Sequence, residues 1–197
     1  PDEEVIAVDP EMLGRIFENL LAIQSDDTKE AARKNAGAFY TPRPIVSYMC
    51  RSVLHRHLGV EINKANSKTI VQKLMDTKVL DPACGSGAFP MGMLEEMMNI
   101  LDQVDPNGTN WVAQVMKSED ADFRSHVSEM FEAGQVRYVK KLGLIRNCLY
   151  GIDLLGYAVE ITKLRCWLSL IIEQEIDLQI HSENYGLKPL PNLDFRF

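Results

Sequence analysis

Long apolar runs are absent from this 197-residue sequence. A membrane-spanning helix needs about 20 consecutive apolar residues, and the best candidate, around Cys166 to Ile172, is cut short by Lys163 and Arg165. No signal peptide is recognisable. We therefore expect a cytoplasmic protein with no membrane partner and, because the first residue is not Met, a piece of a longer chain.

Cysteine is scarce and scattered. None of the cysteines forms a C-x-x-C pair, and no histidine stands at metal-ligand spacing. This pattern argues against a metal site and a disulfide framework, and favours reduced thiols. Cys84 has no basic neighbour in the sequence that would activate it, so a nucleophile is not expected there. The four cysteines are Cys50, Cys84, Cys148 and Cys166.

Positive charge is also in short supply. The sequence has 21 Lys and Arg residues against 28 Asp and Glu residues, which gives a formal net charge of −7. Affinity for duplex DNA depends largely on neutralising phosphates with Lys and Arg. A modest basic cluster runs from Arg137 through Lys140 and Lys141 to Arg146, and we interpret it as a solvated helix face. If DNA is a partner of the parent protein, most of the contact must lie outside this chain.

A strand, a glycine turn and a helix follow one another in residues 78–89. The apolar run that ends this strand is followed by Asp81, and Gly85 and Gly87 lack the side chains that would keep backbone away from a ligand. Residues 88–101 have helical spacing with a proline in the first turn, where its missing N–H costs nothing. The segment predicts a βα unit with a ligand at the turn.

The charge of this turn selects among nucleotide ligands. Dinucleotide enzymes use a related turn, G-x-G-x-x-G, but here Pro90 stands where the third glycine belongs. Asp81 would repel a pyrophosphate and attract an ammonium group. A ligand with an adenosine and a cationic amino-acid end fits better, and S-adenosylmethionine is such a ligand.

Two motifs now carry a resemblance. The residues from Asp81 to Phe89 are similar to D-P-A-x-G-x-G-x-F, the first cofactor motif of DNA adenine-N6 methyltransferases. Gly-Ala-Phe-Tyr-Thr-Pro at 37–42 resembles the motif that precedes it when the cofactor region comes before the catalytic motif. The helical pattern at 13–21 resembles the lead-in of large bacterial restriction-modification methyltransferases. The resemblance implies a type II or IIG-like enzyme that uses S-adenosylmethionine and acts on DNA.

Thr41 lies just before a predicted helix at 45–57. A hydroxyl and free backbone N–H groups at a helix start suit a carboxylate. The resemblance implies that Phe39, Tyr40 and Thr41 close over the methionine end of the cofactor. Alternatively, Thr41 only caps the helix and the two aromatic residues belong to the core.

A third match is Leu-Tyr-Gly-Ile-Asp at 149–153, ahead of a predicted helix at 157–176. In nucleotide folds an acid at the end of the second strand binds ribose hydroxyls, and Asp153 is the candidate. Leu154 would meet the adenine edge. Family members often continue with D-x-D/N-P, and this sequence departs from that pattern with Leu155 and Gly156. Because Asp153 lies well beyond the usual spacing of roughly 20 residues, extra structure must separate the two strands.

The expected fold is therefore α/β, a partial Rossmann-like methyltransferase fold with a helical extension and helical insertions. We divide the chain into a helical lead-in at 1–36 and a truncated cofactor-binding domain at 37–197, with insertions at 59–76 and 102–146. The resemblance implies that Asp81 receives the methionine ammonium group. The remaining loop contacts would be made through the backbone of Ala83, Cys84, Gly85 and Gly87.

The catalytic motif of the resembled family, [N/D]-P-P-[Y/F], has no counterpart, since the sequence contains no Pro-Pro dipeptide. No residue of this chain is therefore predicted to be catalytic, and the fragment is expected to be inactive alone. Cytosine-N4 methyltransferases and phage-defence methyltransferases without restriction remain open alternatives. Two alternatives from other classes also remain open. One is a structural module that keeps the fold without using the cofactor, and the other is a dinucleotide enzyme, against which Asp81 and Pro90 argue.

Overall fold

The computed structural model describes residues 41–174, together with Met12 and Ile16, which are helical and exposed. Most of the predicted helical lead-in lies outside the described residues, as do the candidate site residues Phe39 and Tyr40.

Two short strands form a parallel sheet. β1 (Val79–Asp81) pairs with β2 (Leu149–Gly151), and Leu80 lies opposite Tyr150. Parallel strands need a long crossover connection, and four helices supply it. They are α5 (Ala88–Val104), α6 (Thr109–Val115), α7 (Ala121–Glu132) and α8 (Val136–Cys148). The described part of the chain is thus mostly helical around a small parallel sheet, and the extra structure expected between the two strands consists of these helices.

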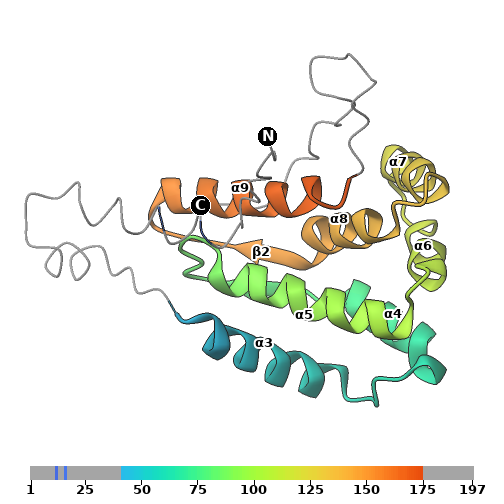
Figure 1. Cartoon of the computed structure of the whole chain (residues 1–197), viewed down its shortest axis with the longest axis horizontal. Helices are drawn as coiled ribbons and strands as arrows, with labels where there is room; N and C mark the ends of the chain where they lie inside the picture. The colour runs from blue at the N-terminus through green and yellow to red at the C-terminus, as the bar shows by residue number, and fades with distance from the viewer. Residues whose placement is uncertain (1–11, 13–15, 17–40, 175–197) are drawn as a thin grey trace, which may run out of the picture.

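Helix α5 lies at the centre of the molecule. It contacts α3 (Arg43–Leu58) on one side and α8 and α9 (Gly156–Ile171) on the other, as well as both strands (Figure 1). The helices expected at 45–57, 88–101 and 157–176 correspond to α3, α5 and α9. Helix α3 buries one residue per turn from Val46 to Leu58 against α5. Gly92 permits this close approach, because a Cβ there would lie 2.5 Å from Val46 Cγ1.

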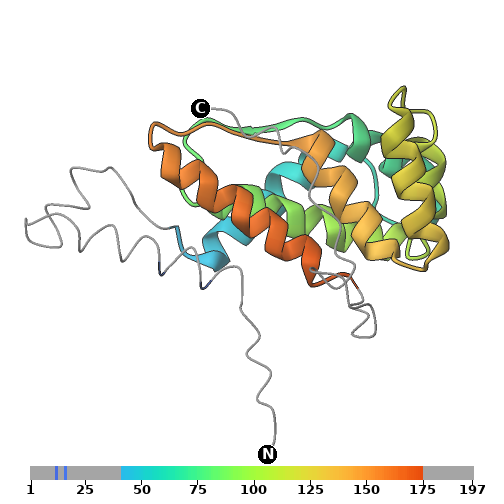
Figure 2. The same ribbon diagram turned by 90° about the horizontal axis from the view of Figure 1, so that it is seen from above.

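The two predicted insertions pack into the same core. Residues 59–76 form a short 3-10 turn (Lys64–Asn66) and α4 (Ser67–Asp76), which contacts α5, α6 and α8. Helices α6 and α7 lie at one end of the molecule in both views (Figures 1 and 2). Trp111 of α6 is fully buried and donates its indole N–H to the carbonyl of Val139 at 3.3 Å. These segments therefore extend one continuous hydrophobic core.

The basic cluster on α8 differs from the sequence prediction. Lys140 is fully buried, and its ammonium group reaches the carbonyls of Leu101 and Pro106 and the carboxylate of Asp102. Lys141 is also buried and pairs with Glu173 at 2.5 Å. The prediction of a solvated helix face was wrong for these two residues, because α5 and the segment after α9 supply oxygen acceptors that compensate their charges.

Candidate cofactor site

The site lies where the strands end and the helices begin. The first turns of α3, α5 and α9 and the carboxyl ends of both strands lie at the same end of the molecule (Figure 1). Two loops meet there, residues 82–87 after β1 and 152–155 after β2. Ile152 donates its N–H to the carbonyl of Asp81, and Cys84 donates its N–H to the carbonyl of Ile152, both at 2.9 Å. The two loops therefore form one hydrogen-bonded unit.

Asp81 has one satisfied and one unsatisfied carboxylate oxygen. Its Oδ1 accepts the N–H of Ala83 at 3.1 Å. Its Oδ2 is buried and has no hydrogen-bond partner among the described residues. Burial raises the pKa of this carboxyl above its ordinary value, the Ala83 hydrogen bond lowers it, and the nearby charge of Asp153 raises it. A buried acceptor without a partner is unfavourable, so a cationic donor bound here would relieve a cost already present in the fold.

Asp153 connects the two loops. Its Oδ2 accepts the N–H of Gly85 at 2.8 Å, and its Oδ1 accepts the N–H of Leu155 at 2.9 Å. Each carboxylate oxygen retains acceptor capacity for a second donor. The predicted ribose acid therefore has a structural role that sequence reasoning did not assign. Beside it, Leu154 is fully exposed.

The two loop glycines serve different purposes. Gly85 has φ +53°, and a Cβ there would meet nothing within 4 Å, so a side chain at this position would project into open space. Gly87 has φ +86°, and a Cβ there would lie 2.8 Å from Cγ2 and Oγ1 of Thr162. The missing side chain of Gly87 thus makes room for α9, whereas a side chain at Gly85 would project into open space.

Cys84 is buried within the loop. Burial raises the pKa of its thiol to about 11, and the charges of Asp81 and Asp153 act in the same direction. A thiol with this pKa is protonated at neutral pH and is a poor nucleophile. The described residues also contain no cluster of three or more His, Cys, Asp or Glu side chains that could hold a metal ion.

Thr41 is half-buried and precedes α3. The N-cap of α3 is Pro42, and no side chain caps the helix. The alternative in which Thr41 serves as a helix cap is therefore wrong.

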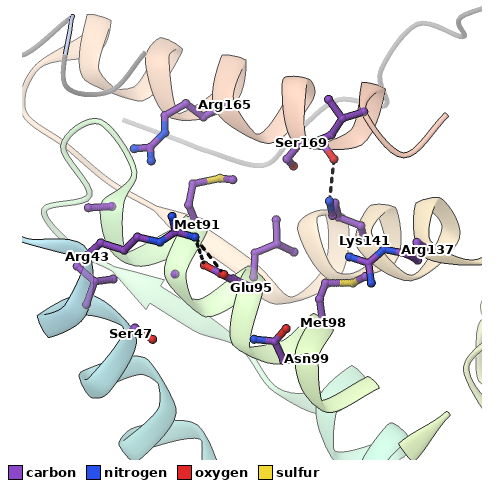
Figure 3. Close-up of a pocket in the computed structure, with 15 residues that line it drawn as sticks. Arg43, Ser47, Met91, Glu95, Met98, Asn99, Arg137, Lys141, Arg165 and Ser169 are labelled. Carbon is purple, nitrogen blue, oxygen red and sulfur yellow. Dashed lines mark hydrogen bonds and ion pairs between the residues drawn. The ribbon is translucent and has the colours of Figure 1, made fainter. Parts of the chain in front are cut away.

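A cavity of about 310 Å³ adjoins the loop (Figure 3). It lies between α3, α5, α8 and α9, and Ala88 and Arg165 line it next to the glycine turn. Arg43 and Glu95 form an ion pair at 3.2 Å in its wall.

Within residues 41–174, no helix has both the length and the hydrophobicity needed to cross a membrane.

Comparison with known proteins decides the family. A family model described as N-6 DNA Methylase matches residues 8–115, which is more than half of the chain. The chain belongs to the N-6 DNA methylase family. The matched range includes β1, the glycine loop and α5, whereas β2 and Asp153 lie beyond it.

The chain is also similar to a protein of Methanocaldococcus jannaschii that is named as a type II restriction enzyme and methyltransferase. The two are 28% identical over 221 aligned positions, which cover 98% of this chain and 16% of the relative. The chain thus spans about one sixth of the length of that relative. No solved structure matches the chain.

Two residues at the loop were missed by sequence reasoning. Thr162 and Arg165 on α9 bind the carbonyls of Gly85 and Ser86, at 3.0 and 2.6 Å. Both side chains are buried, at 0% and 3% exposure. The available signal was a polar pair three residues apart on a mostly apolar helix, since that spacing places both on one side of a helix.

Proposed function

We propose that this chain is the S-adenosylmethionine-binding part of a site-specific DNA adenine-N6 methyltransferase that serves restriction-modification. Membership of the N-6 DNA methylase family supports the reaction class, and the name of the relative supports the biological setting. The observation that carries the cofactor assignment is Oδ2 of Asp81, which is buried and has no hydrogen-bond partner within residues 41–174, beside the open turn at Gly85.

The residues present fit this cofactor. Asp81 would accept the methionine ammonium group, which would convert an unsatisfied buried oxygen into a charge-assisted hydrogen bond. Thr41, with Phe39 and Tyr40, would hold the carboxylate end near the start of α3, where the positive end of the helix dipole favours an anion. Asp153 would accept from the ribose hydroxyls with its remaining lone pairs, and Leu154 would pack on the adenine ring.

S-adenosylmethionine supplies an activated methyl group when bound. This chain would bind and orient it, through the side chain of Asp81 and through the loop backbone of Ala83, Cys84, Gly85 and Gly87. Because the sequence lacks a Pro-Pro dipeptide, we assign the groups that hold the target base to other parts of the parent enzyme. Because the net charge of this chain is −7, we assign most of the DNA contact to other parts of the parent enzyme as well.

Several further features belong to the same proposal. The parallel β1–β2 pair covered by α5 would be the cofactor half of a Rossmann-like sheet. The chain would consist of a helical lead-in at 1–36 and a truncated domain at 37–197. Acting on DNA, the parent would work in the cytoplasm, and this chain alone would transfer no methyl group.

Isothermal titration calorimetry with S-adenosylmethionine tests the assignment. Asp81→Asn removes the carboxylate charge with little change of shape, and we expect affinity to fall about 10- to 100-fold. Asp122→Asn is the matched control, because Asp122 is exposed on α7, at the end of the molecule away from the loop (Figure 1). Binding that Asp81→Asn leaves unchanged would contradict the site, and the absence of binding by the wild-type chain would contradict the function proposed for it.

A further inference from the structure

The carbonyls of the glycine loop are bound from within the protein. The carbonyl of Cys84 accepts the N–H of Gly87 at 2.8 Å. The next two carbonyls, of Gly85 and Ser86, accept from Thr162 and Arg165. Helix α9 therefore supplies a fixed support for the loop.

The hydroxyl of Thr162 lies within hydrogen-bonding distance of both the loop and its own helix. Its single hydroxyl proton has two candidate acceptors, the carbonyl of Gly85 at 3.0 Å and that of Ala158 at 3.2 Å. A threonine inside a helix always has the second type of acceptor available. The loop bond is the shorter one, and the close packing of Thr162 on Gly87 brings the loop within its reach.

Burial of the charged side chain of Arg165 carries a large desolvation cost. A guanidinium group removed from water is unfavourable unless its N–H groups find acceptors. With 3% exposure, Arg165 directs one donor at the carbonyl of Ser86, at 2.6 Å, while its side chain lines the cavity shown in Figure 3. Through this hydrogen bond, Arg165 connects the middle of α9 to the part of the loop that precedes α5.

We propose that Thr162 and Arg165 are positioning residues that hold the glycine loop in its ligand-binding geometry. They act from behind the loop and do not touch the ligand. Their contacts fix the turn at Gly85 and Gly87, and the Asp153 bond to the N–H of Gly85 fixes the same turn from the other side. The consequence for ligand affinity rests on the function proposed above, whereas the consequence for loop order does not.

Amide hydrogen exchange in the ligand-free chain tests loop order directly. Thr162→Val keeps the size and the methyl contact but loses the hydroxyl, and Arg165→Met loses the donor. We expect the amides of Cys84, Gly85 and Gly87 to exchange about tenfold faster in each variant. Thr162→Ser, which keeps the hydroxyl, should stay near wild type. Ser169→Ala should also stay near wild type, because Ser169 is buried on α9 and its hydroxyl donates to the carbonyl of Cys166 and not to the loop.

Ligand titration supplies a second test. We expect S-adenosylmethionine to bind about tenfold more weakly to Thr162→Val, and 5′-methylthioadenosine, which lacks the amino-acid end, to bind within twofold of wild type. Unchanged loop exchange in both Thr162→Val and Arg165→Met would overturn the inference. If the wild-type chain binds no S-adenosylmethionine, the proposed function fails, and the exchange experiment still decides whether α9 orders the loop.

Discussion

Gly85 donates its N–H to Oδ2 of Asp153 at 2.8 Å, so the loop after β1 is held by the acid that follows β2. The two residues are 68 positions apart in the sequence. This bond means that the glycine loop and Asp153 form one unit. A change at either residue should therefore alter both the stability of the chain and its ligand affinity.

Replacing Asp153 should lower the stability of the chain, and the loss should depend on the substitution. Asp153→Ala leaves the N–H groups of Gly85 and Leu155 without their acceptor, and we expect a loss of about 1–3 kcal/mol in the free energy of unfolding. Asp153→Asn has one side-chain oxygen in place of two, so it should retain part of that stability. Urea unfolding measures both. An Asp153→Ala variant as stable as wild type would show that the bond contributes nothing.

The two loop glycines should respond differently to alanine. Gly85→Ala introduces a Cβ into open space, so its cost is the strain of a positive φ, about 1–2 kcal/mol. Gly87→Ala adds to that strain a collision with Thr162, and we expect it to be clearly more destabilising. Urea unfolding of the pair provides the comparison. Equal losses would mean that α9 does not pack on the loop as described.

Replacing Asp81 should have opposite effects on the stability of the ligand-free chain and on ligand binding. Its folded-state pKa is raised above the ordinary value of 3.8, chiefly by burial. The protonated form is therefore favoured by folding, and this stabilisation is lost as pH rises through the folded-state pKa. At pH 7 we expect Asp81→Asn to stabilise the ligand-free chain while it weakens S-adenosylmethionine binding. Thermal unfolding at pH 7 measures the first effect, and a lower Tm for the variant would contradict it.

The same carboxyl predicts a pH dependence of ligand affinity. A cation binds the ionised form of the carboxyl. Affinity should therefore fall as pH falls through the pKa of Asp81, which lies above the ordinary value of 3.8. Calorimetric titrations at successive pH values down to the limit of folding measure this. The fall should be absent in Asp81→Asn, and an identical pH dependence in the two proteins would assign the titration to another group.

The cysteines should be unreactive in the folded chain. All four are buried, and burial raises the thiol pKa to about 11 for Cys50, Cys84 and Cys148 and to about 12 for Cys166. We expect a disulfide reagent at pH 8 to label all four only after denaturation. Rapid labelling of Cys84 in the native chain would mean that the loop opens to solvent.

Sequence reasoning predicted local features well. Turn residues and apolar spacing correctly gave the strand, turn and helix around Gly85, because those signals lie within a few residues of each other. It did not predict Thr162 and Arg165 beneath the loop. Their contacts lie 77 and 79 residues away in the sequence and depend on how α9 packs. Burial of Lys140 was missed for the same reason, since its acceptors come from the end of α5 and the turn after it.

The most direct test of the central claim is a nuclear magnetic resonance titration of the 197-residue chain with S-adenosylmethionine. The account predicts shifts concentrated in the amides of residues 81–87 and 153–155, and their loss in Asp81→Asn. Shifts confined to the residues that line the cavity of Figure 3, such as Ser47 and Asn99, would contradict it. So would a spectrum that S-adenosylmethionine does not change.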